Sequence, residues 1–172
     1  MSELGRLFVE ETIRRFREEY LPRLETAVAA VPADKLWWRP HSEATSIGNL
    51  LLHLEGNVRQ WFLAGLGEQR EPRRERSAEF RAREAVGVSG ERLCKALKET
   101  VETSYPVLTG LTDSQLAKEL EIQGFRVTGL AAVYHVVEHF SWHLGQIVWI
   151  AKATAGPGHG IVFYDDDSLD RH

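Results

Sequence analysis

A long and mostly apolar run, from Gly129 to about Thr154, constrains this chain more than any other segment. Its apolar residues surround the helix almost completely, which predicts burial on more than one side. Thr128 is suited to cap its N-terminus, and the sequence Ala155-Gly156-Pro157-Gly158 ends it. At 1.5 Å per residue the helix extends roughly 39 Å, which is enough to run the length of a helical bundle.

Three further segments show the three- and four-residue spacing of amphipathic helices: 3–30, 46–66 and 89–111. We expect a kink or a short break in the first of them at Pro22. Four helices of comparable length, joined by one long charged crossover and shorter connections, predict an all-α, four-helix bundle whose helix order stays open. Residues 1–155 form the one predicted domain, and residues 156–172 form a C-terminal tail.

The connections differ in character. The segment from Glu68 to Arg83, EQREPRRERSAEFRAR, is nearly all charged. We expect a solvated connection that is held to the core at Phe80 and is helical in its second half. After the third helix, residues 112–119 predict a short helical turn. Residues 121–127 predict a small extended loop, too short to form a sheet.

Composition excludes several classes of function. The 172 residues include 21 basic and 25 acidic side chains, a net charge of −4, so the chain lacks the positive field of a nucleic-acid-binding protein. No stretch reaches the roughly 18 apolar residues that span a bilayer, and the N-terminus is acidic where a signal peptide is basic. A single cysteine, Cys94, cannot close an intramolecular disulfide. We therefore expect a cytoplasmic protein without nucleic-acid or membrane partners.

Three of the seven histidines, His135, His139 and His143, fall on one face of the last predicted helix. Two imidazoles four residues apart can bind one divalent ion at roughly 2.0 to 2.1 Å. A third ligand is available from His53, which lies on the core-facing side of the second helix. The alternative is that these are half-buried histidines bonded to the backbone or to Glu138. No glutamate follows the first histidine, which argues against a zincin protease.

Two sequences, LHLEGNVRQW at 52–61 and HFSWHLGQI at 139–147, together with the charged stretch that ends at Phe80, resemble the DinB/YfiT-like superfamily of metal-dependent enzymes. The likeness is greatest to an uncharacterised branch of it, and covers residues 4–152. It implies a four-helix bundle, often a homodimer, that binds a divalent metal such as nickel or zinc. By the resemblance the metal ligands are His53, His139 and His143, and His135 is an addition to the pattern.

Three neutral imidazoles leave at least one coordination position for water or substrate, as in reactive metal sites. Some members of the superfamily are S-transferases or isomerases that use low-molecular-weight thiols. The resemblance thus implies a metal-dependent thiol S-transferase acting on a small electrophile, with a metal-dependent hydrolase as the weaker reading. The alternative from another class is a non-catalytic bundle that binds a metal or ligand, or serves as an interaction module.

Four further side chains are candidates for the wall of a substrate pocket: Trp38, Arg59, Trp61 and Trp142. The alternative is that the tryptophans pack in the core or an interface and that the arginine is solvated. Cys94 lies among apolar neighbours and is expected to be inert.

Overall fold

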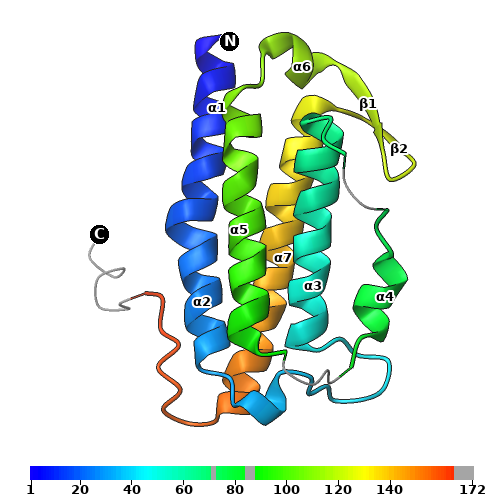
Figure 1. Ribbon diagram of the computed structural model, residues 1–172. Helices are drawn as coiled ribbons and strands as arrows, with labels where there is room; N and C mark the ends of the chain where they lie inside the picture. Colours follow the sequence, from blue (N-terminus) through cyan, green and yellow to red (C-terminus); the bar gives the residue numbers. More distant parts are fainter. Residues whose placement is uncertain (71–72, 84–87, 165–172) are drawn as a thin grey trace.

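Four long helical rods lie side by side in the computed structural model, which describes residues 1–70, 73–83 and 88–164 (Figure 1). The predicted all-α, four-helix bundle is thereby confirmed. The first rod consists of α1 (Glu3–Arg14), the π-helix η1 (Arg15–Tyr20) and α2 (Leu21–Ala29); the second of α3 (Ile47–Val58) and the π-helix η3 (Arg59–Leu66); the third is α5 (Gly90–Thr109) and the fourth is α7 (Gly129–Ala155).

The direction of the rods follows from their connections. The first and fourth rods run one way and the second and third run the other way, so the long crossover joins two parallel rods (Figure 1). Both α2 and α3 pack against α5 and α7. α3 and α7 are therefore antiparallel neighbours, which brings the two histidine-bearing segments face to face.

The predicted helix boundaries are confirmed where side chains cap them. The Ser46 hydroxyl accepts the backbone N–H of Asn49 at the start of α3, and Thr128 accepts that of Ala131 at the start of α7. Pro22 does not break the first rod, because the chain stays helical through it. The irregularity lies directly before it in η1, where the Leu21 N–H bonds to the Phe16 carbonyl, five residues back.

Smaller elements connect the rods: the 3₁₀ helix η2 (Ala33–Lys35), α4 (Arg76–Arg81), α6 (Asp113–Ala117) and the strands β1 (Glu119–Ile122) and β2 (Phe125–Thr128). The expectation that 121–127 is too short for a sheet is wrong, since β1 and β2 pair as an antiparallel hairpin. Gln123 and Gly124 form its turn with φ of 56° and 79°. Two central residues at positive φ match the twist of a two-residue hairpin, so four residues pair on each side.

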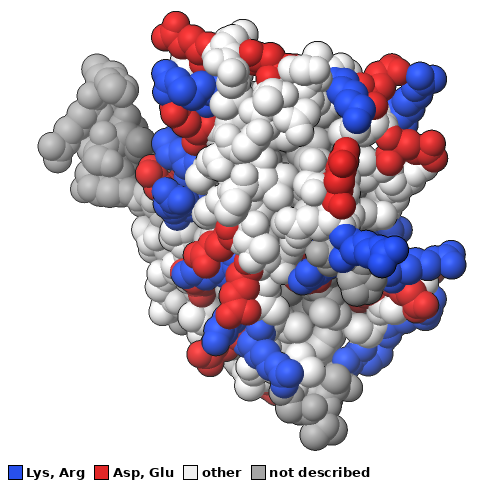
Figure 2. All heavy atoms as spheres, turned by 45° about the horizontal axis from the view of Figure 1, so that its top comes forward, with Lys and Arg blue, Asp and Glu red and all other residues white. Residues whose placement is uncertain are grey.

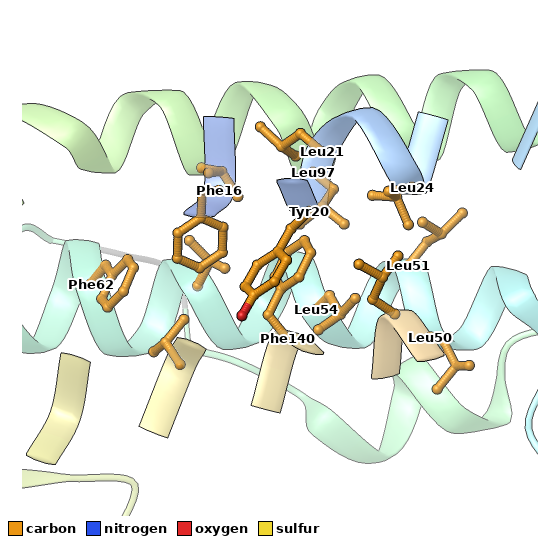
Figure 3. Close-up of a cluster of buried hydrophobic side chains, with 14 of the residues drawn as sticks. Phe16, Tyr20, Leu21, Leu24, Leu50, Leu51, Leu54, Phe62, Leu97 and Phe140 are labelled. Carbon is orange, nitrogen blue, oxygen red and sulfur yellow. The ribbon is translucent and has the colours of Figure 1, made fainter. Parts of the chain in front are cut away.

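The core is built from aromatic and leucine side chains of the rods (Figure 3). Phe16 of η1 meets Phe140 of α7 edge to face at 5.1 Å between ring centroids, and Tyr20 stacks on Phe140 at 5.7 Å. Burying each such side chain contributes roughly 1.5–3 kcal/mol. Phe140 adjoins His139 in sequence, so the core packing also fixes the orientation of α7 at the histidines.

The surface carries charge of both signs. On the face shown in Figure 2, acidic and basic side chains surround an uncharged central area. Among the described residues, no helix combines the length and the apolar character that crossing a membrane requires.

Candidate metal centre

Three imidazoles from two facing helices converge on one point. One ring nitrogen each of His53 on α3 and of His139 and His143 on α7 lies within 4.8 Å of the other two. The Nε2 atoms of His53 and His139 are 2.9 Å apart, and the rings of His139 and His143 are 4.4 Å apart between centroids. His135 does not belong to this group and lies one turn earlier on α7. The structure thus brings together the three histidines that were predicted as metal ligands.

A largely buried carboxylate orients His53. The imidazole is 2% exposed, and its Nδ1 lies 2.9 Å from Glu79 Oε2. Arg74 donates to both oxygens of that carboxylate, from Nε at 2.6 Å and from Nη2 at 2.9 Å. An arginine is always a donor, so the carboxylate is ionised and accepts the Nδ1–H of His53. This tautomer leaves a lone pair on Nε2, which faces His139, as in carboxylate–histidine–metal arrangements.

Arg74 and His53 also approach each other directly. Arg74 Nη2 also lies 3.0 Å from His53 Nδ1. In the tautomer above, both atoms are donors, so this approach is no hydrogen bond. It results from their sharing the Glu79 carboxylate, and Nη2 has another acceptor in the His53 carbonyl at 3.1 Å.

Electrostatics keep Glu79 charged. Burial would by itself raise the pKa of the Glu79 carboxyl. The hydrogen bonds from His53 and Arg74 outweigh burial, so the pKa of Glu79 lies below its ordinary value. The carboxylate is therefore available to accept a proton-bearing nitrogen at neutral pH.

The other two imidazoles are held neutral. Burial, together with the repulsion of the neighbouring histidines when they are charged, lowers the pKa of His139 to about 3. Burial also lowers the pKa of His143, against the opposing effect of its hydrogen bond to Gln146. That bond joins His143 Nδ1 to Gln146 Oε1 at 2.7 Å, so Nδ1 carries the proton and Nε2 has the lone pair. Neutral imidazole is the form that ligates a metal.

The connection after η3 contributes more than the sequence indicated. Phe80 packs against the His53 ring at 4.6 Å between centroids, which confirms the expected contact at Phe80. Arg74 and Glu79 were expected to be solvated, yet their side chains are only 9% and 12% exposed. These two residues are the functional candidates that sequence reasoning missed.

Gly56 on α3 leaves space for the side chains of Arg74 and Glu79. A Cβ at Gly56 would lie 2.5 Å from Glu79 Oε1 and 2.7 Å from Arg74 Nε, closer than real contacts allow. A glycine in a helix interior is unfavourable, so Gly56 in the sequence His-Leu-Glu-Gly-Asn was the one signal of a close approach. Asn49 fixes the same connection, because its Nδ2 donates to the carbonyls of Glu79 at 2.7 Å and Ala82 at 3.0 Å.

The four predicted pocket residues lie in different places. Trp61 is buried and its ring lies 4.0 Å from that of His135, while Trp142 is 68% exposed and its ring stacks 6.4 Å from that of His143. Trp38 is half-buried and packs against the core. The Arg59 guanidinium bonds to Glu55 and to Thr100 on α5.

The chain's single cysteine lies apart from these groups, on α5. Cys94 is buried, and burial raises the pKa of its thiol to about 11. The thiol is therefore protonated at neutral pH, as expected for an inert core cysteine.

Comparison with known proteins agrees with this architecture. A family model described as "Protein of unknown function (DUF1572)" matches residues 3–159. The crystal structure of a DinB-like protein (YjoA) from Bacillus subtilis is similar with a TM-score of 0.62 and 20% sequence identity, over 86% of this chain and 94% of that chain. No curated protein matches. At this identity the likeness shows the fold alone, and it confirms the DinB-like fold that the resemblance in the sequence implied. The chain therefore belongs to the DUF1572 family and has the DinB-like fold.

Proposed function

We propose that the protein is a divalent-metal-dependent enzyme with His53, His139 and His143 as the metal ligands. The observation that carries this is the convergence of their ring nitrogens within 4.8 Å. Two nitrogens bound to one tetrahedral ion at 2.0–2.1 Å are about 3.3 to 3.4 Å apart, so the 2.9 Å separation of His53 and His139 needs only a small adjustment. Neutral imidazole suits nickel and zinc among the divalent metals.

The expected reaction uses the open side of this centre. His53 is buried, while His139 and His143 are only half-buried, so the α7 side of the centre is the one nearer to solvent. We propose S-transfer: the thiol sulfur bonds to an electrophilic carbon of a small substrate, the leaving group departs from that carbon, and the thiol proton passes to solvent.

The thiol has to be a separate molecule. Cys94 is buried, and its raised pKa keeps it protonated. A low-molecular-weight thiol is therefore the proposed co-substrate. Glu79 and Arg74 hold His53 on one side of the centre, and the proposed thiol and electrophile approach from the other side.

The test combines metal analysis with an activity screen. Protein purified without a histidine tag or chelator is expected to contain about one equivalent of nickel or zinc. With that metal, cysteine, glutathione and related thiols are then assayed against 1-chloro-2,4-dinitrobenzene, which releases chloride as the carbon–sulfur bond forms. Turnover that needs no thiol supports a hydrolase instead. A metal-loaded protein that turns over no substrate supports the non-catalytic bundle.

We also propose a homodimer. On α7 three aromatic side chains lie largely exposed on the outer surface: Tyr134, Trp142 and Trp149. Hollows lie on either side of Trp142, one reaching Arg15 and Glu138 and the other reaching Glu43. Large exposed aromatic residues beside recesses are typical of protein interfaces, and a second copy of the same face is the simplest occupant by two-fold symmetry.

A further inference from the structure

Asn57 has an unusual environment for a buried amide. It lies on α3 one turn after His53 and is 3% exposed. Its Oδ1 has no hydrogen-bond partner among the described residues. Asn49, also buried on this helix, differs: its Oδ1 accepts from Ser46 and Arg39, and its Nδ2 donates to two carbonyls. Buried polar groups are nearly always paired, so this acceptor, which the described residues leave unpaired, is available to a ligand or a water.

His135 orients that amide. Its ring packs against the rings of Trp61 and His139, at 4.0 Å and 5.3 Å between centroids, and these two contacts restrict its movement. Its Nε2 lies 3.4 Å from Asn57 Nδ2. Nδ2 can only donate, so Nε2 accepts, and the amide keeps Oδ1 as its free acceptor. The histidine that the metal-binding pattern does not require thus acquires a role as a positioning residue.

The residue that carries the free acceptor lies one helical turn from the metal centre. Because α3 and α7 are antiparallel, His53 meets His139 and, one turn along, Asn57 meets His135. The two layers are separated by about one helical pitch, 5.4 Å. A ligand whose sulfur takes the open position therefore needs only a short spacer to reach Asn57.

We infer that Asn57 Oδ1 accepts a hydrogen bond from an N–H group of the thiol co-substrate, and that His135 holds the amide in place for it. This rests on the proposed metal-dependent function. The chemical class that fits is a thiol with an amide N–H about two carbons from its sulfur. The amide of such a ligand pairs the buried acceptor, whereas an ester in its place leaves the acceptor unpaired.

A matched pair of probes tests the inference. Cobalt(II) replaces the native metal, so that its visible absorption reports metal binding and the sulfur–cobalt charge-transfer band reports thiol binding. N-acetylcysteamine and 2-mercaptoethyl acetate differ only in N–H against ester oxygen. The wild-type protein is expected to bind the amide about tenfold more tightly, the usual worth of one hydrogen bond in a buried site.

Two variants remove the effect by different routes. Asn57→Leu, of nearly the same size, is expected to bind both probes equally while its cobalt affinity stays within about twofold. His135→Phe keeps an aromatic ring between Trp61 and His139 but loses the acceptor for Nδ2. It is expected to reduce the amide preference, and it keeps the inference testable if Asn57→Leu does not fold.

The failures are distinguishable. Absence of cobalt absorption in the wild type overturns the metal centre and the subsite together. Cobalt absorption with equal affinities for the two probes in the wild type overturns the subsite alone and assigns the acceptor to water. An amide preference that persists unchanged in Asn57→Leu also overturns it.

Discussion

His53 and Glu79 are 26 residues apart in sequence, yet His53 Nδ1 lies 2.9 Å from Glu79 Oε2. The contact joins the apolar interior of α3 to the most highly charged connection of the chain. It sets the tautomer of the imidazole and directs Nε2 at the facing helix. The geometry of the candidate centre therefore depends on the crossover as well as on the two helices that carry the histidines.

Removing a ligand should remove the metal. His53→Ala, His139→Ala and His143→Ala are each expected to lose most of the metal that copurifies with the wild type, because two imidazoles bind an ion much more weakly than three. Elemental analysis per mole of protein measures this. The exposed His41 provides the control, and His41→Ala should keep its metal. Full metal content in His53→Ala would exclude α3 from the centre.

Weakening the carboxylate should weaken the metal site without emptying it. Glu79→Gln keeps the shape of the side chain but removes the negative charge. The carboxylate that accepts hydrogen bonds from Arg74 and His53 is thereby lost. We expect metal affinity to fall about 10- to 100-fold, the usual effect of a partner to a ligating histidine. Competition with a chromogenic chelator gives the affinity. The exposed neighbour Glu75 supplies the matched control, Glu75→Gln; an equal loss in both variants would refute the role of Glu79.

Two helical glycines allow a paired comparison. At Gly145 a Cβ meets no atom within 4 Å, so Gly145→Ala should stabilise the metal-free protein by up to about 1 kcal/mol through helix propensity. At Gly56 the same methyl group displaces Arg74 and Glu79. Gly56→Ala should therefore lower the affinity for metal. Its free energy of unfolding in urea should change by less, in energy terms, than its free energy of metal binding. Unaltered metal affinity in Gly56→Ala would show that the close approach is unimportant.

Lowering the pH should destabilise the metal-free protein already at pH values above those at which carboxylates titrate. In the unfolded chain His139 takes up a proton near its ordinary pKa of 6.5, whereas in the folded protein its pKa is about 3. The unfolded state therefore binds more protons, and stability falls as pH drops below about 6.5. Urea unfolding between pH 7.5 and 5 is expected to show a shallower fall in His139→Leu. Equal slopes in wild type and variant would contradict the depressed pKa.

The proposed dimer can be tested on the exposed face of α7. Trp142→Lys introduces a charge where a second copy would pack and is expected to shift the protein from dimer to monomer in sedimentation. Leu130, exposed on the first turn of the same helix, provides the control Leu130→Lys. A wild-type protein that sediments as a monomer at all concentrations would disprove the proposal.

The predictable features were those encoded by local spacing. The capping residues Ser46 and Thr128 precede regular apolar patterns, so the starts of α3 and α7 were correct. The candidate ligands were predictable because a four-residue step keeps His139 and His143 on one face, and His53 lies on the core side of its helix. The hairpin was missed because Gln at the first turn position is not the usual residue for positive φ.

The partners of His53 were not predictable for a different reason. An arginine and a glutamate in a charged run have the same local pattern whether they are solvated or buried. Arg74 and Glu79 are buried because they pair with each other and because His53 and Gly56, on another element, admit them. Burial of a charge depends on such distant partners, which spacing within the run does not reveal.

Asn49 extends this dependence to folding. Its side chain takes part in the capping box that starts α3, and it also ties the carbonyls of Glu79 and Ala82 to that helix. The first turn of α3 and the docking of the crossover are thus a single cooperative unit. Fraying of that turn would release the Glu79 carboxylate from His53. Loss of order at one end of α3 would then leave a metal ligand more than a full turn away without the partner that orients it.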